Sequence, residues 1–154
     1  MQVNRSTDYA LRAMTFLASQ PEGMIFMVNE IAVDQGVPPK FLARILQLLH
    51  KAHLVESHRG IRGGFQLARI PQQITVLHVL EAVEGPLSLS LCLTQPEICD
   101  QSERCPSLGV WERAQAAFRR VLASTTLADL AAEQQRLDQA IKLPSLSAPA
   151  LVKP

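Results

Sequence analysis

The stretch that most restricts the possible folds of this chain runs from residue 28 to residue 54. Its first part, VNEIAVDQ, carries apolar residues at helical spacing, and Gly36 follows as a residue that accepts the left-handed backbone of a helix end. After two prolines, which suit a helix entrance, KFLARILQLLHKAHL predicts a second helix over residues 40–54. A short helix, a turn and a second helix together predict a helix-turn-helix motif.

The second of these helices divides into an apolar side and a basic side. Its buried stripe is expected to contain Phe41, Leu42, Ile45, Leu48 and Leu49. Lys40, Ala43 and Arg44 lie off that stripe, directly after Pro39, and are expected to face outward. An exposed basic side on the second helix is the arrangement with which such motifs contact DNA.

A β-hairpin is predicted directly after the second helix. Residues 55–58 and 65–68 alternate apolar and polar side chains, as short strands do. Between them, RGIRGG combines arginines with glycines, which allow tight bends and close approach to another surface. Because narrow minor grooves attract arginine, the hairpin is expected to act as a DNA-binding wing, with a plain solubilising hairpin as the alternative. The candidate contacts in the wing are His58, Arg59, Gly60, Arg62 and Gly63.

The distribution of charge supports this interpretation better than the total, which is only +1. Between Lys40 and Arg69 there are six basic residues and one acid, Glu56, so this segment carries +5 and the rest of the chain is net acidic. A local basic stripe indicates a surface that meets phosphates. The sequence has no run of about 18 apolar residues and no N-terminal leader pattern, so we expect a cytosolic protein without a membrane span.

Further helices are predicted over residues 6–19, over residues 75–84 and from Pro106 onward. In the last of these, apolar side chains recur at spacings of three, four and three residues, as in a coiled-coil seam. The seam residues are Trp111, Ala114, Phe118 and Val121. We expect this seam to pair with a second copy of the chain, and packing within one chain is the alternative. Thr126 and Asp129 predict the start of a short last helix.

All three cysteines, Cys92, Cys99 and Cys105, lie in one stretch between two predicted helices. In a reducing compartment, an odd set of thiols indicates metal ligation or redox chemistry rather than structural disulfides. The spacing is wider than the Cys-x2-Cys knuckles of structural zinc, whereas an iron–sulfur cluster accepts looped ligation by soft thiolates. Cys105 also stands at a predicted helix start, where N–H groups favour a thiolate. We therefore favour an iron–sulfur cluster, with zinc, a thiol–disulfide switch or incidental cysteines as alternatives.

Several segments in order carry a resemblance to a known family: TDYALRAM, then PPKFLARILQLLHKAHLVESHRGIRGGFQLAR, then TVLHVLEAVEGPL, the three cysteines, LGVWERAQAAF and TLADL. Over about residues 1–135 the chain resembles the Rrf-type bacterial transcription regulators, which include the IscR-, NsrR- and RirA-like iron–sulfur sensors. The resemblance implies a homodimer of winged helix-turn-helix domains, joined by crossed long helices, that binds palindromic DNA operators. It implies that Lys40, Ala43 and Arg44 enter the major groove. It also implies that Arg59 and Arg62 meet the minor groove or phosphates, and that the cysteines are the cluster ligands.

The fourth ligand of the cluster differs between branches of this family. IscR-like members have a histidine three residues after the third cysteine, and Leu108 stands at that position here. Some NsrR-like members use an aspartate from the first helix of the partner subunit, and Asp8 stands at the matching position. An acid in the first turn also stabilises the helix dipole, which gives Asp8 a structural explanation as well. A 4Fe–4S cluster is favoured and a 2Fe–2S cluster is the alternative.

The expected fold is mainly α with a small β wing: a winged helix-turn-helix domain followed by a long dimerisation helix. The expected divisions are residues 1–85 for DNA binding, 86–105 for the cluster loop, 106–143 for the dimerisation and C-terminal helices, and 144–154 for a disordered tail. The expected function is an iron–sulfur-dependent DNA-binding regulator, preferably a repressor, that senses nitric oxide, redox state or iron supply. The alternatives are a cluster-free regulator switched by cysteine oxidation and a zinc or iron–sulfur metabolic protein. An enzyme is not expected, since the sequence holds no Ser/His/Asp, HExxH, P-loop or GxGxxG arrangement.

Overall fold

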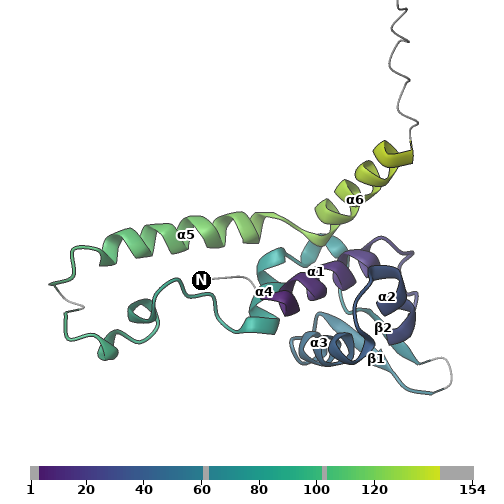
Figure 1. The fold of residues 1–154 in the computed structure, drawn as a ribbon, viewed down its shortest axis with the longest axis horizontal. Coiled ribbons are helices and arrows are strands. Elements are labelled where there is room, and N and C mark those ends of the chain that lie inside the picture. Colours follow the sequence, from purple (N-terminus) through teal and green to yellow (C-terminus); the bar gives the residue numbers. More distant parts are fainter. Residues whose placement is uncertain (1–3, 61–62, 102–103, 143–154) are drawn as a thin grey trace, which may run out of the picture.

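The computed structural model describes residues 4–60, 63–101 and 104–142, which form helices around a small two-stranded sheet (Figure 1). The helices are α1 (Arg5–Ala18), α2 (Val28–Gln35), α3 (Pro39–Lys51), α4 (Val76–Glu84), α5 (Leu108–Ser124) and α6 (Leu127–Lys142). The strands are β1 (Val55–His58) and β2 (Gly64–Leu67). This confirms the predicted fold class. Among the described residues, every helix is too short or too polar to cross a lipid bilayer.

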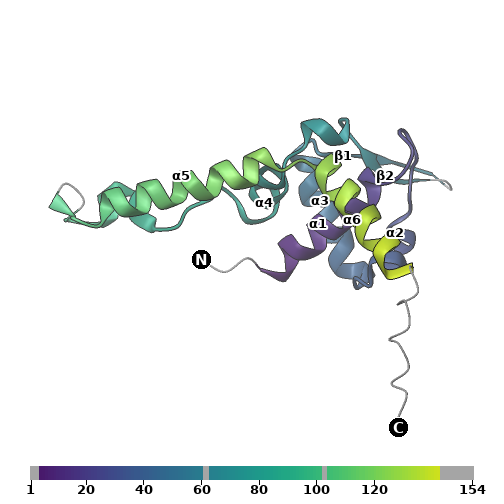
Figure 2. The same ribbon diagram turned by 90° about the horizontal axis from the view of Figure 1, so that it is seen from above.

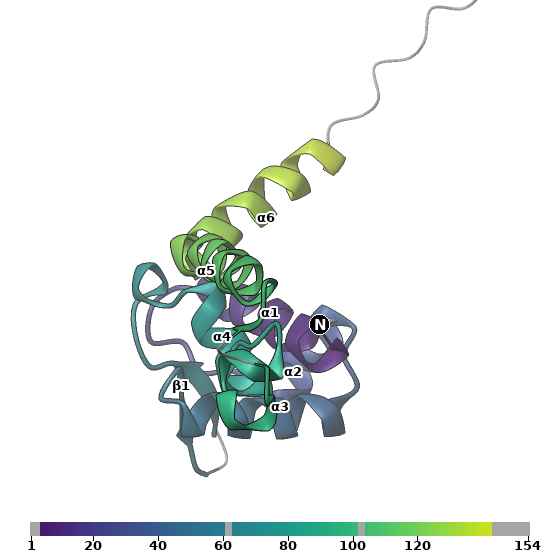
Figure 3. The ribbon, with the colours of Figure 1, turned by 90° about the vertical axis from the view of Figure 1, so that its left-hand side faces the viewer.

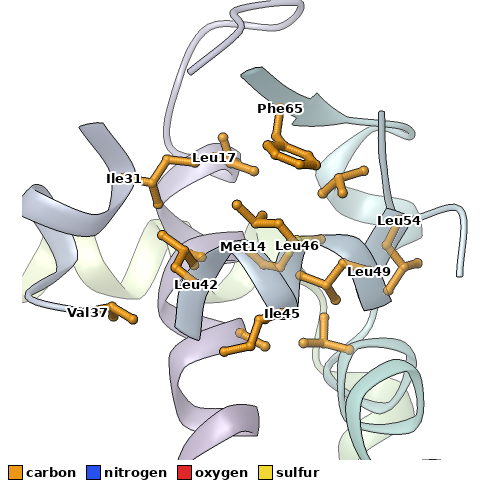
Figure 4. Packing of buried hydrophobic residues seen from close by; sticks show 14 of the residues in the cluster. Met14, Leu17, Ile31, Val37, Leu42, Ile45, Leu46, Leu49, Leu54 and Phe65 are labelled. Atoms are coloured by element: carbon orange, nitrogen blue, oxygen red, sulfur yellow. The ribbon is translucent and has the colours of Figure 1, made fainter. Parts of the chain in front are cut away.

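The main core lies where α1, α2, α3 and α4 meet the sheet (Figure 4). Each element contributes apolar side chains that are almost fully removed from water, and burying one of them stabilises the fold by about 1.5–3 kcal/mol. They include Met14, Ile31, Leu42, Leu46, Leu49, Val55, Phe65 and Val79. An antiparallel bridge between Phe26 and Phe65 ties the segment before α2 to the sheet. The helix-turn-helix and the hairpin therefore form one packed unit.

The buried side of α3 differs from the expected one. The residues that it buries are Leu42, Ile45, Leu46 and Leu49. Phe41 is 57% exposed and Leu48 is 38% exposed, so the prediction that both point inward was wrong. The physical reason is that the four buried residues occupy an arc of about 100° around the helix, and Phe41 and Leu48 lie about 40–60° beyond the edge of that arc at Ile45.

The hairpin follows α3 closely. The helix ends at Lys51 rather than at Leu54, as His53 takes a left-handed backbone conformation with φ of 55° and turns the chain toward β1. The strands pair antiparallel, with Val55 opposite Leu67. The predicted strands are confirmed to within one residue.

The second half of the chain leaves the core and returns to it. Figures 1 and 2 show α5 projecting from the body, with the segment between α4 and α5 running beside it. The chain returns where Thr126 bridges Thr75 and the Leu127 N–H donates to the Ile74 carbonyl oxygen at 2.8 Å. From there α6 packs on α1 and runs for 16 residues, so the expectation of a short last helix was wrong. The predicted domain divisions stay predictions, although Leu127 shares the main core with the N-terminal helices.

The tail predicted as disordered, residues 144–154, lies outside the described residues.

Replacing Leu127 by alanine is expected to lower the free energy of unfolding by about 2–5 kcal/mol, because a fully buried side chain leaves a cavity. The matched control is Ile141→Ala on the same helix, where 82% of the residue is exposed and the change should stay within about 0.5 kcal/mol. Urea unfolding followed by circular dichroism at one protein concentration measures both. Equal effects would contradict the anchoring of α6 in the core.

Candidate DNA interface and cysteine loop

α3 and the hairpin lie on one side of the body, and α5 and α6 lie on the other (Figures 1 and 3). Lys40 and Arg44 of α3 and Arg59 after β1 are all exposed. Within the described part of the chain, none of these three cations forms a salt bridge. Exposed, unpaired basic side chains on one side of a protein provide contacts for the phosphates of a nucleic acid.

The predicted contact residues of α3 gather in its first two turns. Pro39 is the first residue of the helix and is exposed, as are Lys40 and Arg44, whereas Ala43 is half-buried. Sequence reasoning missed Phe41, whose exposed ring lies between these residues along the helix. The signal that could have found it is the spacing of residues 42, 45, 46 and 49, which completes a buried stripe without it.

The base of the wing needs glycine at two of the predicted positions. Gly60 has φ of 105°, which side chains other than glycine rarely adopt. A Cβ on Gly63 would lie 2.5 Å from the His58 carbonyl oxygen, and the Gly63 N–H donates to the Gly60 carbonyl oxygen at 2.9 Å. The His58 ring is half-buried, with Nε2 3.8 Å from a Glu56 carboxylate oxygen, too far for a hydrogen bond. Arg62 lies outside the described residues.

The predicted seam on α5 is only partly covered by the rest of the chain. Phe118 packs beside a small buried cluster of Leu77, Leu80 and Leu87. Trp111 remains 42% exposed, Val121 remains 62% exposed and Ala114 is half-buried. Packing within one chain therefore accounts for part of the seam, and the rest of the stripe is free to meet another surface.

The three cysteines are distributed along the segment between α4 and α5. Cys92 lies in a short 3₁₀ turn at Leu91–Leu93, Cys99 directly follows another at Pro96–Ile98, and Cys105 lies three residues before α5. All three are free thiols and are half-buried. The structure thus places them in one loop, beside the long helix.

Hydrogen bonds hold the start of this loop against the two helices that flank it. The carboxylate of Glu81 on α4 accepts from the Leu87 N–H at 3.3 Å and from the Arg119 guanidinium of α5 at 2.5 Å. The Leu89 N–H donates to the Gln115 side chain of α5 at 3.0 Å. The loop is therefore fixed at its base, before Cys92.

Cys105 has the environment of a reactive thiol. Its sulfur lies 3.1 Å from the Ser107 hydroxyl oxygen. Hydrogen bonds from the Ser107 side chain, from the Ser107 backbone and from the Leu108 backbone lower the pKa of the Cys105 thiol below its ordinary value, and desolvation opposes them. These donors belong to the start of α5, as expected for a helix N-terminus beside a thiol.

The predicted ligands are not gathered at one point. No three His, Cys, Asp or Glu side chains among the described residues lie close enough to hold a metal ion. Asp8 is exposed on α1, pairs with Arg12 at 3.1 Å and lines a groove between α1 and α6. The chemistry of the donor set still fits an iron–sulfur cluster, since it offers three soft thiols in one loop. The described residues from Cys92 to Cys105 include no fully buried side chain, so little packing opposes a rearrangement that gathers the thiols.

A helix-turn-helix with a basic outer side, a hairpin wing and a long projecting helix define a winged-helix regulator of transcription. The family model Rrf2, described as an iron-dependent transcriptional regulator, matches residues 3–133. The chain therefore belongs to the Rrf2 family of transcriptional regulators, which confirms the resemblance found in the sequence.

Individual relatives agree with this assignment. The chain is 32% identical over 144 residues to the HTH-type transcriptional regulator NsrR of Halalkalibacterium halodurans, covering 93% of this chain and 99% of the relative. It is similar to the structure of CymR, the global cysteine regulator of B. subtilis, with 30% identity and a TM-score of 0.71 over 86% of this chain and 98% of that one. It is also similar to T. potens IscR, with 28% identity and a TM-score of 0.66 over 94% and 93%. The family and these relatives are regulators and not enzymes.

Replacing Ser107 by alanine is expected to raise the pKa of Cys105, because it removes the strongest of the hydrogen bonds that stabilise the thiolate. Alkylation of Cys105 by iodoacetamide in metal-free protein at neutral pH should then slow several-fold, as followed by mass spectrometry. Ser90→Ala, which removes the hydroxyl 3.1 Å from the Cys92 sulfur, is the control and should leave the Cys105 rate unchanged. An unaltered rate in the Ser107 variant would contradict the assigned cause.

Proposed function

We propose that this Rrf2-family chain is a homodimeric repressor that binds operator DNA. Its affinity for DNA depends on an iron–sulfur cluster held by Cys92, Cys99 and Cys105. The observation that carries the proposal is the position of the cysteine loop. The loop joins α4, which packs on α1 and α3, to α5, which projects from the body. A change in the shape of the loop therefore acts on both sides: through α4 on the recognition helix α3, and directly on α5.

The DNA-binding part of the proposal places α3 in the major groove. Lys40 and Arg44 then lie at the end of the helix that approaches the bases, and Arg59 of the wing lies at the minor groove or its phosphates. Support comes from the exposure of all three side chains and from the absence of a salt bridge to any of them among the described residues.

Replacing Arg44 by alanine is expected to weaken operator binding and to reduce the slope of log affinity against log salt by about one, because one positive charge facing the DNA is lost. Fluorescence anisotropy over a range of salt concentrations measures this slope. Arg136→Ala is the control, since Arg136 lies on α6 and pairs with Glu133, and its slope should match that of the wild type. Equal slopes for all three proteins would contradict the placement of α3.

In the proposed dimer, the exposed apolar side chains of α5 pair with those of a second copy. Trp111 and Val121 are the exposed members of the predicted seam, and Val110 beside them is 52% exposed. Two reading heads joined in this way meet half-sites about one helical turn of DNA apart. The arrangement also allows Asp8 of the partner subunit to serve as the fourth ligand, which a single chain does not bring to the loop.

When bound, the cluster supplies an iron centre that reacts with nitric oxide or oxygen. The residues of the chain bind the cluster and connect it to the neighbouring helices. Cys92, Cys99 and Cys105 would hold the cluster and thereby fix the shape of the loop, and hydrogen bonds of Glu81 and Gln115 connect the base of the loop to α4 and α5. Without a bound cluster, Cys92, Cys99 and Cys105 would no longer constrain the loop, so the spacing of the two DNA-binding domains and the operator affinity would change.

Replacing all three cysteines by alanine is expected to abolish iron binding and to make operator affinity indifferent to nitric oxide. Iron analysis, the visible absorption spectrum and anisotropy on protein prepared without oxygen measure these effects. Asp8→Asn should change the spectrum or speed the loss of iron, whereas Asp34→Asn, at an exposed acid on α2, should do neither. Unchanged iron content and operator binding in the triple variant would contradict the proposal.

A regulator that senses thiol oxidation without a cluster is the second candidate. It is favoured by three free thiols, by the lowered pKa of Cys105 and by the similarity to a cysteine regulator. It predicts an anaerobic preparation that is colourless and free of metal, with operator affinity that responds to diamide and recovers with dithiothreitol.

A further inference from the structure

We propose that Phe41 and Leu48 form an apolar strip on the outer side of α3 that reads thymine methyl groups of the operator. The inference rests on the proposed function, in which α3 enters the major groove. The basic side chains on this surface account for affinity toward phosphates of any sequence. The apolar strip would add specificity for particular bases.

Phe41 and Leu48 are more exposed to solvent than the apolar residues beside them on α3. Phe41 is 57% exposed and Leu48 is 38% exposed, although the neighbouring Leu42 and Leu49 are completely buried. They are seven residues apart, which is about two turns, so both lie on the same side of α3. The same exposed side carries Lys40 and Arg44.

Neither the core nor the expected dimer helix accounts for this strip. The buried stripe of α3 is complete without Phe41 and Leu48. Figures 1 and 3 place α3 on the side of the body away from α5, which carries the exposed seam residues. The strip is therefore an apolar surface left open on a basic face.

The charge around the strip indicates which kind of molecule binds there. Lys40 and Arg44 are exposed beside it and form no salt bridge among the described residues, so the face as a whole is complementary to a polyanion. A DNA duplex offers negative charge together with an apolar group in the major groove, and that group is the C5 methyl of thymine. Phenylalanine is among the side chains that make this contact.

The geometry also gives a spacing. Phe41 lies in the first turn of α3, the part of a recognition helix that reaches base edges. Leu48 lies about 10.5 Å further along the helix axis, which corresponds to about three base-pair steps. The geometry thus assigns Phe41 to a thymine in each half-site and Leu48 to a methyl about three base pairs from it.

The test removes the methyl groups without altering any hydrogen bond. The wild-type full chain, prepared without oxygen, selects a duplex from a random library. That duplex is then remade with uracil in place of thymine, one symmetric pair of positions at a time. Loss of one methyl contact should weaken wild-type binding about fourfold, and loss at both half-sites about fifteenfold.

The variant that completes the test is Phe41→Ala. It should bind the thymine duplex as weakly as the wild type binds the uracil duplex at the sensitive positions, and it should lose nothing further with uracil. The control is Lys51→Ala, at an exposed basic residue on the last turn of α3, which should respond to uracil as the wild type does. Leu48→Ala repeats the comparison at a second position. The inference can therefore be tested even if the Phe41 variant does not fold.

Four outcomes would overturn the inference. Equal wild-type affinity for thymine and uracil duplexes removes methyl reading while leaving the proposed function intact. Equal uracil losses in the wild type and in both apolar variants assign the methyl contact to other residues. A wild type that binds no duplex at all, with or without iron, overturns the proposed function and the inference together. Reduced self-association of Phe41→Ala in sedimentation, with no methyl effect, would instead assign the strip to a protein contact.

Discussion

The structure depends on a short backbone bridge at which the chain closes on itself. The Val76 N–H donates to the Thr125 carbonyl oxygen at 2.9 Å, and the Leu127 N–H donates to the Ile74 carbonyl oxygen at 2.8 Å. This bridge joins the start of α4 to the start of α6, with the side chain of Leu127 buried beneath it. The cysteine loop and α5 are thereby held at both ends by the core, instead of extending from it as a free tail. A loop held at two points transmits a change of shape to both.

Polar contacts connect the same region to α1. The hydroxyl of Thr7, a fully buried polar side chain, donates to the carboxylate of Glu84 at the end of α4. The Asn4 N–H donates to the same carboxylate at 3.2 Å. Gly85 follows with φ of 84°, and the cysteine loop begins there. The start of α1, which also carries Asp8, is thus bound to the element from which the loop departs. These contacts form a continuous physical connection between the start of α1 and the start of the cysteine loop.

The sequence predicted the elements more successfully than the surfaces. Helical spacing and the RGIRGG hairpin located α1 to α5 and the wing, as strong periodicity and glycine-rich turns are local signals. The sides of α3 were harder, since five apolar residues at positions 41, 42, 45, 48 and 49 fit a wide stripe and the true narrow stripe includes Leu46. The sequence predicted the three cysteines as ligands of one cluster, and among the described residues they do not come together with one another or with Asp8. The described residues from Cys92 to Cys105 have no fully buried side chain, so apolar packing gives no sequence signal for the shape of this part of the loop.

Two of the apolar surfaces that stay exposed on the described part of one chain differ in their surroundings. On α5, Trp111 and Val121 lie on a helix whose charged residues include both signs, such as Glu112 and Arg113, which suits a second copy of the same helix. On α3, Phe41 lies between Lys40 and Arg44, which suits a polyanion and opposes self-pairing through like charges. In the proposed dimer, the surface on α5 would set the distance between the two DNA-binding domains and the surface on α3 would contact the operator. Because the cysteine loop is bonded to α5 and begins where α4 leaves the reading domain, it lies between these two surfaces along the chain. In the proposed dimer, a signal that changes the shape of the cysteine loop would change the relative placement of these two surfaces and therefore the affinity for DNA.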